Sequence, residues 1–217
     1  MLGRPMPLAR LGDRWLPLID RILQAVPASC ASTLDVPNAA RQQLVSWLDL
    51  VVAWSERVDL TAARDPETLA DLLLADAVLL ASTQPTGTMI DVGSGVGAPA
   101  IPLAILAPNA QLTLVEPRER RAAFLRTSCG VIERPDIRLL RTRSMEVEAF
   151  VADVAISRAT LPPPLWLREG ARLAKHAVWV LLGLDEPQLP SWHADLDFSY
   201  DWPLTGGRRR AVRYLRD

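Results

Sequence analysis

Apolar positions in the first part of the chain recur at the spacing of amphipathic helices. Residues 12–26 and 39–56 carry apolar side chains about every 3.6 residues, which predicts a helix over each segment. A further long helix is expected from Pro66, and no strong strand pattern interrupts these segments. We therefore predict that residues 1–85 form a helical N-terminal cap that faces the substrate.

Capping residues set the expected starts of two of these helices. Asn38 is expected to cap the segment 39–56, because an asparagine side chain accepts hydrogen bonds from the first helical turn. Asp65 is a favourable N-cap for the next helix, and Pro66 suits its first position. The stretch from Asp59 to Asp65 is predicted to contain a turn.

After residue 86 the pattern changes to short apolar segments rich in β-branched residues. Five predicted strands recur about every 20 to 30 residues, with helical segments between them. Their sequences are MIDVG, QLTLVEP, DIRLLR, VADVAISRA and HAVWVLLG. Such alternation indicates βαβ units, so residues 86–217 are expected to form an α/β domain with a doubly wound, mostly parallel sheet. Residues 198–216 are predicted to add an antiparallel edge hairpin that turns at 205–207.

Composition narrows the class of protein without naming a partner. The 217 residues are 49% hydrophobic and carry a formal net charge of −1. We expect a soluble cytoplasmic protein, because no apolar run reaches the ~18 residues that span a bilayer and the N-terminus lacks a signal-peptide core. Cys30 and Cys129 match no metal or redox spacing, so no metal site is expected. The arginine-rich stretch 208–216 is open to two interpretations, a solvated surface or a phosphate contact.

A glycine-rich loop follows the first predicted strand, in the sequence IDVGSGVGAPAIPLAIL. This position in a doubly wound sheet places a ligand at the carboxyl end of the strand. Gly93, Gly95 and Ala98 satisfy the dinucleotide pattern G-x-G-x-x-G/A. Gly93, Gly95 and Gly97, preceded by Asp91, equally satisfy the pattern D-x-G-x-G-x-G of proteins that bind S-adenosylmethionine (SAM). A tight turn without a ligand is the third possibility.

Charge favours SAM over a nicotinamide dinucleotide. A carboxylate two residues before the first glycine repels a pyrophosphate, whereas Asp91 attracts the ammonium and sulfonium groups of SAM. At a separation of ~4 Å and an intermediate dielectric such an interaction is worth ~4 kcal/mol, so its sign matters. Glu116, at the end of the second strand, stands where an acid binds both ribose hydroxyls, which suits either cofactor. Ser144, Met145 and Glu146, after the third strand, are expected to hold the adenine.

These motifs together resemble the bacterial RsmG (GidB) family of methyltransferases, over residues 38–185. The segments that carry the resemblance are ERVDLTAARDPE, the glycine loop with its continuation into Pro99 and IPL, TLVEPRERRAAFLR and DVAISRA. The resemblance implies a class I SAM-dependent methyltransferase fold and transfer of a methyl group to N7 of a guanine in small-subunit ribosomal RNA. Its partner would be ribosomal RNA or the 30S subunit, and we expect a monomer.

The resemblance also assigns site residues. The cofactor would be held by Asp91, Gly93, Ser94, Gly95, Gly97, Ala98, Glu116, Ser144, Met145, Glu146 and Arg158. Guanine N7 carries a free lone pair, so no general base is required and catalysis is mostly alignment. Arg158 and Arg143, at two strand ends, are therefore expected to position the acceptor. Arg120, Arg121 and Arg126 lie on the helix after Glu116, and for Arg126 we favour a solvated surface role.

Four positions depart from the family pattern in the direction of less positive charge. Leu72 and Leu73 replace an Arg-His pair, Leu182 replaces a lysine, and Asp59 replaces an asparagine. Phosphate contacts dominate affinity for nucleic acid, so these changes weaken the expectation of RNA binding. Two alternatives follow: a SAM-dependent methyltransferase with a small or peptide acceptor, or a non-catalytic SAM-binding module. An aromatic acceptor site would then draw on Trp166, Trp179, Trp192 and Trp202.

Overall fold

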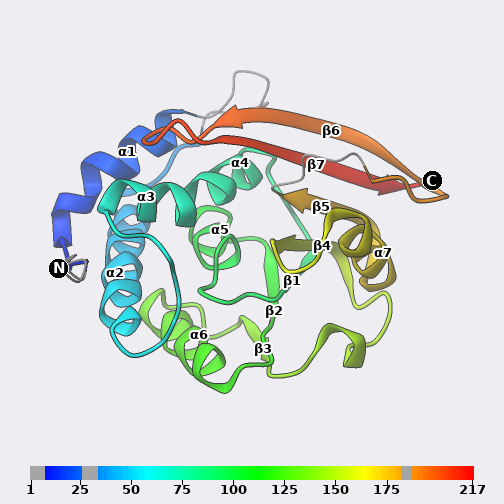
Figure 1. The fold of residues 1–217 in the computed structure, drawn as a ribbon, viewed down its shortest axis with the longest axis horizontal. Helices are drawn as coiled ribbons and strands as arrows, with labels where there is room; N and C mark the ends of the chain where they lie inside the picture. Colours follow the sequence, from blue (N-terminus) through cyan, green and yellow to red (C-terminus); the bar gives the residue numbers. More distant parts are fainter. Residues whose placement is uncertain (1–7, 26–33, 182–186) are drawn as a thin grey trace, which may run out of the picture.

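The computed structural model describes residues 8–25, 34–181 and 187–217. Its centre is a seven-stranded sheet with the strand order β3-β2-β1-β4-β5-β7-β6 (Figure 1). The strands are β1 (Thr88–Val92), β2 (Gln111–Val115), β3 (Arg138–Leu140), β4 (Ala152–Arg158), β5 (Ala174–Leu181), β6 (Trp192–Asp201) and β7 (Arg208–Arg216). The first five pair in parallel, and β7 pairs antiparallel with both β5 and β6. The predicted doubly wound α/β fold with an antiparallel edge hairpin is confirmed.

Helices occupy the chain before the first strand, as the spacing of apolar residues predicts. They are η1 (Gly12–Trp15), α1 (Leu16–Gln24), α2 (Asn38–Ser55), α3 (Pro66–Ala70), η2 (Asp71–Ala75) and α4 (Asp76–Ser82). Asp65 caps α3 as predicted, since its carboxylate accepts from the Thr68 N–H at 2.7 Å. The prediction for Asn38 is wrong: it is the first helical residue, Pro37 takes the N-cap position, and no side chain caps α2.

The helix that begins at Pro66 changes its hydrogen-bonding pattern partway along. Residues of η2 form a π-turn between α3 and α4, which the periodicity of the sequence did not indicate. Asp71 in this turn is fully buried, and its carboxylate accepts hydrogen bonds from the backbone N–H groups of Leu204 and Thr205. The π-turn is thereby fastened to the loop between β6 and β7, far away in the sequence.

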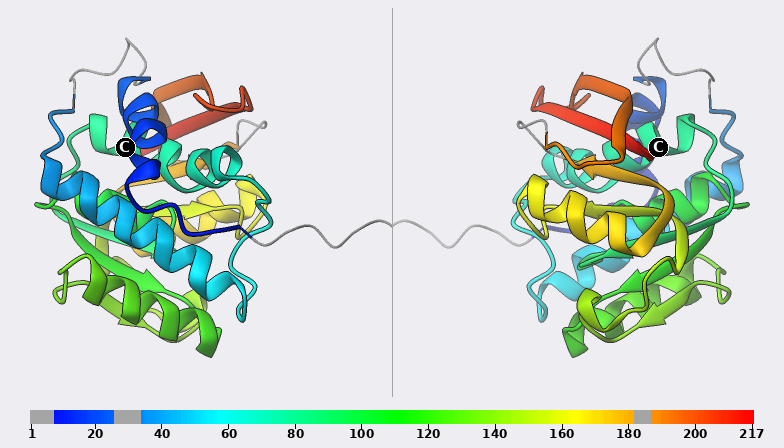
Figure 2. Two further views of the ribbon diagram at one scale, coloured as in Figure 1. Left: turned by 90° about the vertical axis from the view of Figure 1, so that its left-hand side faces the viewer. Right: turned by 90° about the vertical axis from the view of Figure 1, so that its right-hand side faces the viewer.

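Alternation along the strands divides the core between the two faces of the sheet. Met89, Ile156 and Trp179 face the cluster that includes the N-terminal helices, α5 (Ala100–Leu106) and α6 (Glu119–Val131). Ile90 and Val178 face a smaller cluster against α7 (Pro163–Leu173). The opposed views of Figure 2 show α2 in front on one side and α7 in front on the other. The cap and the sheet therefore share one apolar core.

The arginine-rich end of the chain lies on β7, where two of the five arginines are neutralised by aspartates within the hairpin. Arg210 and Arg213 each form a bidentate ion pair with an aspartate of β6. Arg209 lies over the ring of Trp202, with 3.5 Å between its guanidinium carbon and the ring centroid. Arg216 donates to three backbone carbonyls. Internal contacts thus occupy Arg209, Arg210, Arg213 and Arg216, and the choice between a solvated surface and a phosphate contact stays open for this stretch.

Among the described helices, none combines the length and the apolar character that a bilayer crossing needs. Two predictions lie outside the described residues, namely those that concern Cys30 and Leu182.

Candidate functional site

A cavity opens at the carboxyl ends of β1, β2 and β4, beside the glycine loop. Its volume is 430 Å³, within the range of about 300–1,000 Å³ common for small-molecule sites. Six predicted site residues line it: Gly93, Ser94, Gly95, Ala98, Glu116 and Arg158. Sequence analysis did not assign to the site the other lining residues, which are Leu60, Val96, Pro117, Arg118, Arg121, Ala159 and Thr160. Three of these, Val96, Pro117 and Ala159, directly follow a predicted residue along the chain, so their neighbours in the sequence could have indicated them.

The three loop glycines all have positive φ but differ in what surrounds them. A Cβ on Gly93 would lie 2.3 Å from Thr160 Oγ1, and one on Gly97 would lie 2.5 Å from Ile101 Cγ1. These two glycines therefore permit close packing inside the protein. A Cβ on Gly95 would meet no atom nearer than 3.6 Å. Gly95, with φ of +55°, lines the cavity itself, and its lack of a side chain leaves the backbone accessible to a ligand there.

The carboxylate of Glu116 is held rigidly at the cavity by backbone groups. Its Oε2 atom accepts from the Gly95 N–H at 2.9 Å, and its Oε1 atom accepts from the Arg118 N–H at 2.8 Å. Each oxygen keeps a further lone pair for a ligand donor. A buried carboxylate prepared in this way suits a pair of hydroxyl groups, as the ribose of an adenosine cofactor presents.

Asp91 is buried at 1% exposure, and its Oδ2 atom has no hydrogen-bond partner among the described residues. Burial raises the pKa of its carboxyl to about 7. A hydrogen bond with Ser94 and the charge of Arg158 lower the pKa by less, and the charge of Glu116 raises it further. Asp91 and Gly97 are predicted site residues that do not line the cavity. The carboxyl of Asp91 nevertheless interacts electrostatically with Arg158 and Glu116, which do line it. An unpaired buried carboxyl calls for a cationic donor and disfavours a pyrophosphate. These residues fit SAM.

Arg158 reaches the cavity from the end of β4 and is braced from behind. Its Nη1 donates to the carbonyl of Leu72 and lies 3.5 Å from Asp76 Oδ2. Asp76 is 1% exposed, and its Oδ1 accepts from the Tyr200 hydroxyl at 2.6 Å. Next to Arg158, Ala159 adopts a φ of +54°, an uncommon conformation for a residue with a side chain. The chain thus fixes a cationic group at the cavity wall.

The residues predicted to hold the adenine do not line this cavity, nor does Arg143. Ser144, Met145 and Glu146 form the 3₁₀ turn η3 (Ser144–Glu146) after β3. Met145 is 73% exposed. The Glu146 carboxylate accepts from the Thr142 hydroxyl and from the Arg143 N–H, and these bonds lower its pKa. Roles for Arg143 and for the three residues of η3 remain predictions.

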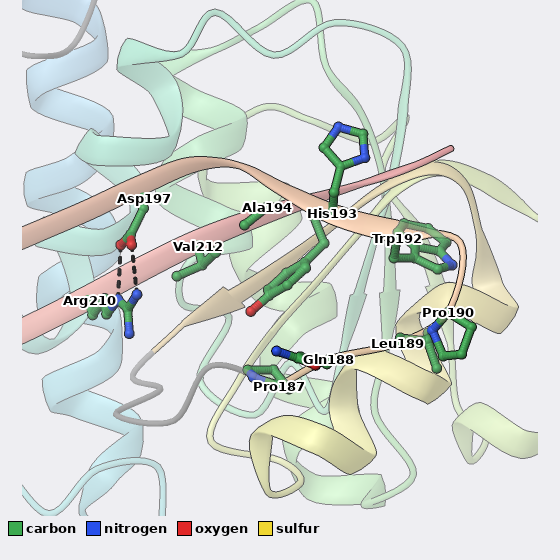
Figure 3. A pocket seen from close by; sticks show the side chains of 11 residues that line it. Pro187, Gln188, Leu189, Pro190, Trp192, His193, Ala194, Asp197, Arg210 and Val212 are labelled. Carbon is green, nitrogen blue, oxygen red and sulfur yellow. Dashed lines mark hydrogen bonds and ion pairs between the residues drawn. The ribbon is translucent and has the colours of Figure 1, made fainter.

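A second cavity of 530 Å³ lies beside the hairpin and is built from residues 187–214 alone (Figure 3). The Asp197–Arg210 ion pair stands at its edge. It contains no residue of the glycine loop or of β1 to β4. Of the four tryptophans considered for an aromatic acceptor site, Trp192 lines this cavity, whereas Trp166, Trp179 and Trp202 do not. The four side chains therefore do not gather at one site.

Comparison with known proteins identifies the lineage of the chain. The family model GidB, rRNA small subunit methyltransferase G, matches residues 40–163. A ribosomal RNA small subunit methyltransferase G from Methylobacillus flagellatus is 32% identical over 158 residues, which cover 71% of this chain and 77% of that protein. One from Neisseria meningitidis is 35% identical over 130 residues, 59% of this chain and 63% of the relative. The chain therefore spans less than two thirds of the second relative.

Solved structures show the same fold at low sequence identity. An O-methyltransferase from Bacillus cereus, in complex with SAH, matches with a TM-score of 0.56 and 14% identity over 79% of this chain and 91% of that one. TrmN from Thermus thermophilus matches with a TM-score of 0.52 and 18% identity over 80% of this chain and 53% of that one. The class I methyltransferase fold is confirmed, and SAM rather than a nicotinamide dinucleotide is its cofactor. By the extent of these matches, the chain belongs to the GidB family, rRNA small subunit methyltransferase G.

Proposed function

We propose that this chain transfers a methyl group from SAM to N7 of a guanine in small-subunit ribosomal RNA, acting as a monomer in the cytoplasm. The observation that carries the proposal is the buried, unpaired carboxyl of Asp91 beside the prepared carboxylate of Glu116. Together they suit a ligand that is cationic at one end and carries ribose hydroxyls at the other. The names of the relatives supply the acceptor, ribosomal RNA.

SAM supplies a methyl group bonded to a positively charged sulfur. Transfer breaks the carbon–sulfur bond and forms a carbon–nitrogen bond, and the purine ring takes over the positive charge. Guanine N7 has no proton to lose, so the chain needs no general base. This agrees with the cavity, whose titratable lining residues are Glu116 and the arginines 118, 121 and 158.

The residues of the chain then act by placement. Asp91 and Glu116 would bind the two ends of the cofactor. Because Gly95 has no side chain, the cofactor could also approach the backbone of the glycine loop closely. Arg158, braced by Asp76 and Leu72, is a fixed donor that can orient the guanine or a neighbouring phosphate. Holding the reacting atoms in line before reaction contributes much of the rate enhancement that such a site can deliver.

The test is methyl transfer to 30S particles whose guanine N7 positions are unmodified. Purified protein with radiolabelled SAM should label the 16S RNA, and borohydride–aniline cleavage should place the label at one N7-methylguanine. Arg158→Lys, which keeps the charge but loses the fork of donors, should reduce kcat more than it changes the Kd for SAM. Labelling of another molecule in the particle, or labelling at a position resistant to this cleavage, would reject the proposed acceptor.

A further inference from the structure

A cleft of 710 Å³ lies next to the cofactor cavity, on the side of the N-terminal cap. It runs between the segment 8–10, the end of α2 with the residues that follow, and the first turn of α6. Three arginines line it, Arg10, Arg57 and Arg120, against one acidic side chain, Glu56. The cleft therefore carries a net charge of about +2 within a protein whose overall charge is −1.

The three cleft arginines differ from those of the hairpin in being unpaired. All three are exposed, and their guanidinium groups have no ion-pair or hydrogen-bond partner among the described residues. On β7, by contrast, Arg210 and Arg213 are neutralised by aspartates. An unpaired cation on a concave surface keeps its full attraction for a polyanion, whereas a paired one has already lost most of it.

The cleft and the cofactor cavity have no lining residue in common, but the same two segments of the chain border both. Arg118 and Arg121 line the cavity, and Arg120 between them lines the cleft. In the loop after α2, Val58 lines the cleft and Leu60 lines the cavity. A chain molecule with one unit in the cavity would thus continue naturally along the cleft.

An aromatic side chain adds a second type of contact. Trp54 lines the cleft and is half-buried, fixed by an edge contact with Phe124 at 5.5 Å between ring centroids. A rigid ring among unpaired arginines is the combination that binds unpaired nucleotides, with stacking for bases and positive charge for phosphates.

We propose that this cleft is the docking surface for the phosphodiester backbone of single-stranded ribosomal RNA next to the methylated guanine. The inference rests on the proposed function for the identity of the polymer. Arg57 and Arg120 each contact a phosphate, Arg10 extends the track, and Trp54 offers a stacking face. The Arg208–Arg216 strand takes no part in it.

The test measures filter binding of labelled 16S RNA over 50 to 300 mM KCl. Each lost phosphate contact on a single strand lowers the slope of log K against log salt by ~0.7. The double variant Arg57→Gln/Arg120→Gln should therefore flatten the slope by ~1.4 and weaken binding at 100 mM KCl by roughly 25-fold. Its KM for RNA should rise while its Kd for SAM stays unchanged, which also shows that it is folded. Arg210→Gln/Arg213→Gln removes the same two charges from β7 and should leave the slope unchanged.

The outcomes separate the docking surface from the methylation itself. Wild-type methylation with an unchanged slope in the cleft variant overturns the docking surface and leaves the proposed function intact. Binding that depends on the cleft without any labelling at guanine N7 supports the docking surface and rejects the function. Failure of wild-type protein to bind RNA overturns the docking surface. Cleft-dependent binding to phosphatidylglycerol vesicles together with cleft-independent RNA binding overturns it in favour of a membrane surface.

Discussion

The buried carboxyl of Asp91 makes SAM binding dependent on pH in a range where most carboxyl groups are already ionised. Burial raises its pKa to about 7, so half of the free protein carries a neutral Asp91 at neutral pH. The ammonium of SAM stays largely protonated below pH 7 and favours the ionised carboxylate. Asp91 must therefore lose its proton when SAM binds. The apparent Kd for SAM should rise by about fifteenfold as the pH falls from 7 to 5.5.

Calorimetry of SAM binding across this range is the direct measurement. Asp91→Asn should bind more weakly at pH 7 and should show almost no pH dependence, because it has no proton to lose. Glu116→Gln is the comparison variant: it weakens binding by removing a charged acceptor and should still show a dependence on pH, with its midpoint moved to lower pH because the charge of Glu116 helps to raise the pKa of Asp91. A wild-type Kd that changes less than twofold between pH 7 and 5.5 would refute the role of Asp91.

The same carboxyl predicts an opposite effect on stability. Because its folded pKa lies above the unfolded value of 3.8, the folded state binds more protons between pH 4 and 7. The free energy of unfolding should therefore fall as pH rises through this window, by up to about 4 kcal/mol from this group. Urea unfolding should show that the difference in the free energy of unfolding between wild type and Asp91→Asn narrows, or reverses in favour of the variant, at pH 8. A variant that is at least as stable yet binds SAM poorly would separate a ligand-binding role from a structural one.

Four substitutions test other parts of the site. Glu116→Gln should raise the Kd for SAM by about 10- to 100-fold in calorimetry, since hydrogen bonds to a charged acceptor contribute about 1.5–3 kcal/mol. Gly97→Ala should lower the free energy of unfolding in urea by about 1–3 kcal/mol, because its φ is +89° and its new Cβ would lie 2.5 Å from a side chain. Gly95→Ala, whose Cβ would make only ordinary contacts at 3.6 Å and beyond, should cost less stability and mainly weaken SAM binding. Tyr200→Phe removes a hydrogen bond from buried Asp76, which should cost about 1–3 kcal/mol in the same urea assay and lower kcat.

The local patterns that encode the sheet were readable because each depends on neighbours in the sequence. Strands alternate with helices, and the hairpin turn and the Asp65 cap lie where local chemistry puts them. The loop glycines and Glu116 share one cavity because parallel strands bring their carboxyl ends to one edge. That relation holds for any doubly wound sheet, so no knowledge of distant contacts was needed.

Features set by tertiary contacts were not readable. The π-turn at Asp71 exists where a buried carboxylate accepts from Leu204 and Thr205, more than a hundred residues later. The pairing of Arg210 and Arg213 depends on the register of β7 against β6, which places Asp197 two residues along β6 from the partner of Arg210 and Asp195 next to the partner of Arg213. The sequence of a run of arginines does not show whether the fold places aspartates close enough to pair with them.

The positions that seemed to weaken RNA binding have a different role in this fold. Leu73 is fully buried in the main core, and Leu72 is half-buried with its carbonyl accepting from Arg158. A side chain at position 73 therefore contributes to packing rather than to the electrostatic field outside the protein. The charge that a polyanion meets comes instead from exposed, unpaired groups such as Arg57 and Arg120. Position 72 thus supports Arg158 through a backbone carbonyl that any residue supplies, and neither leucine lines the basic cleft.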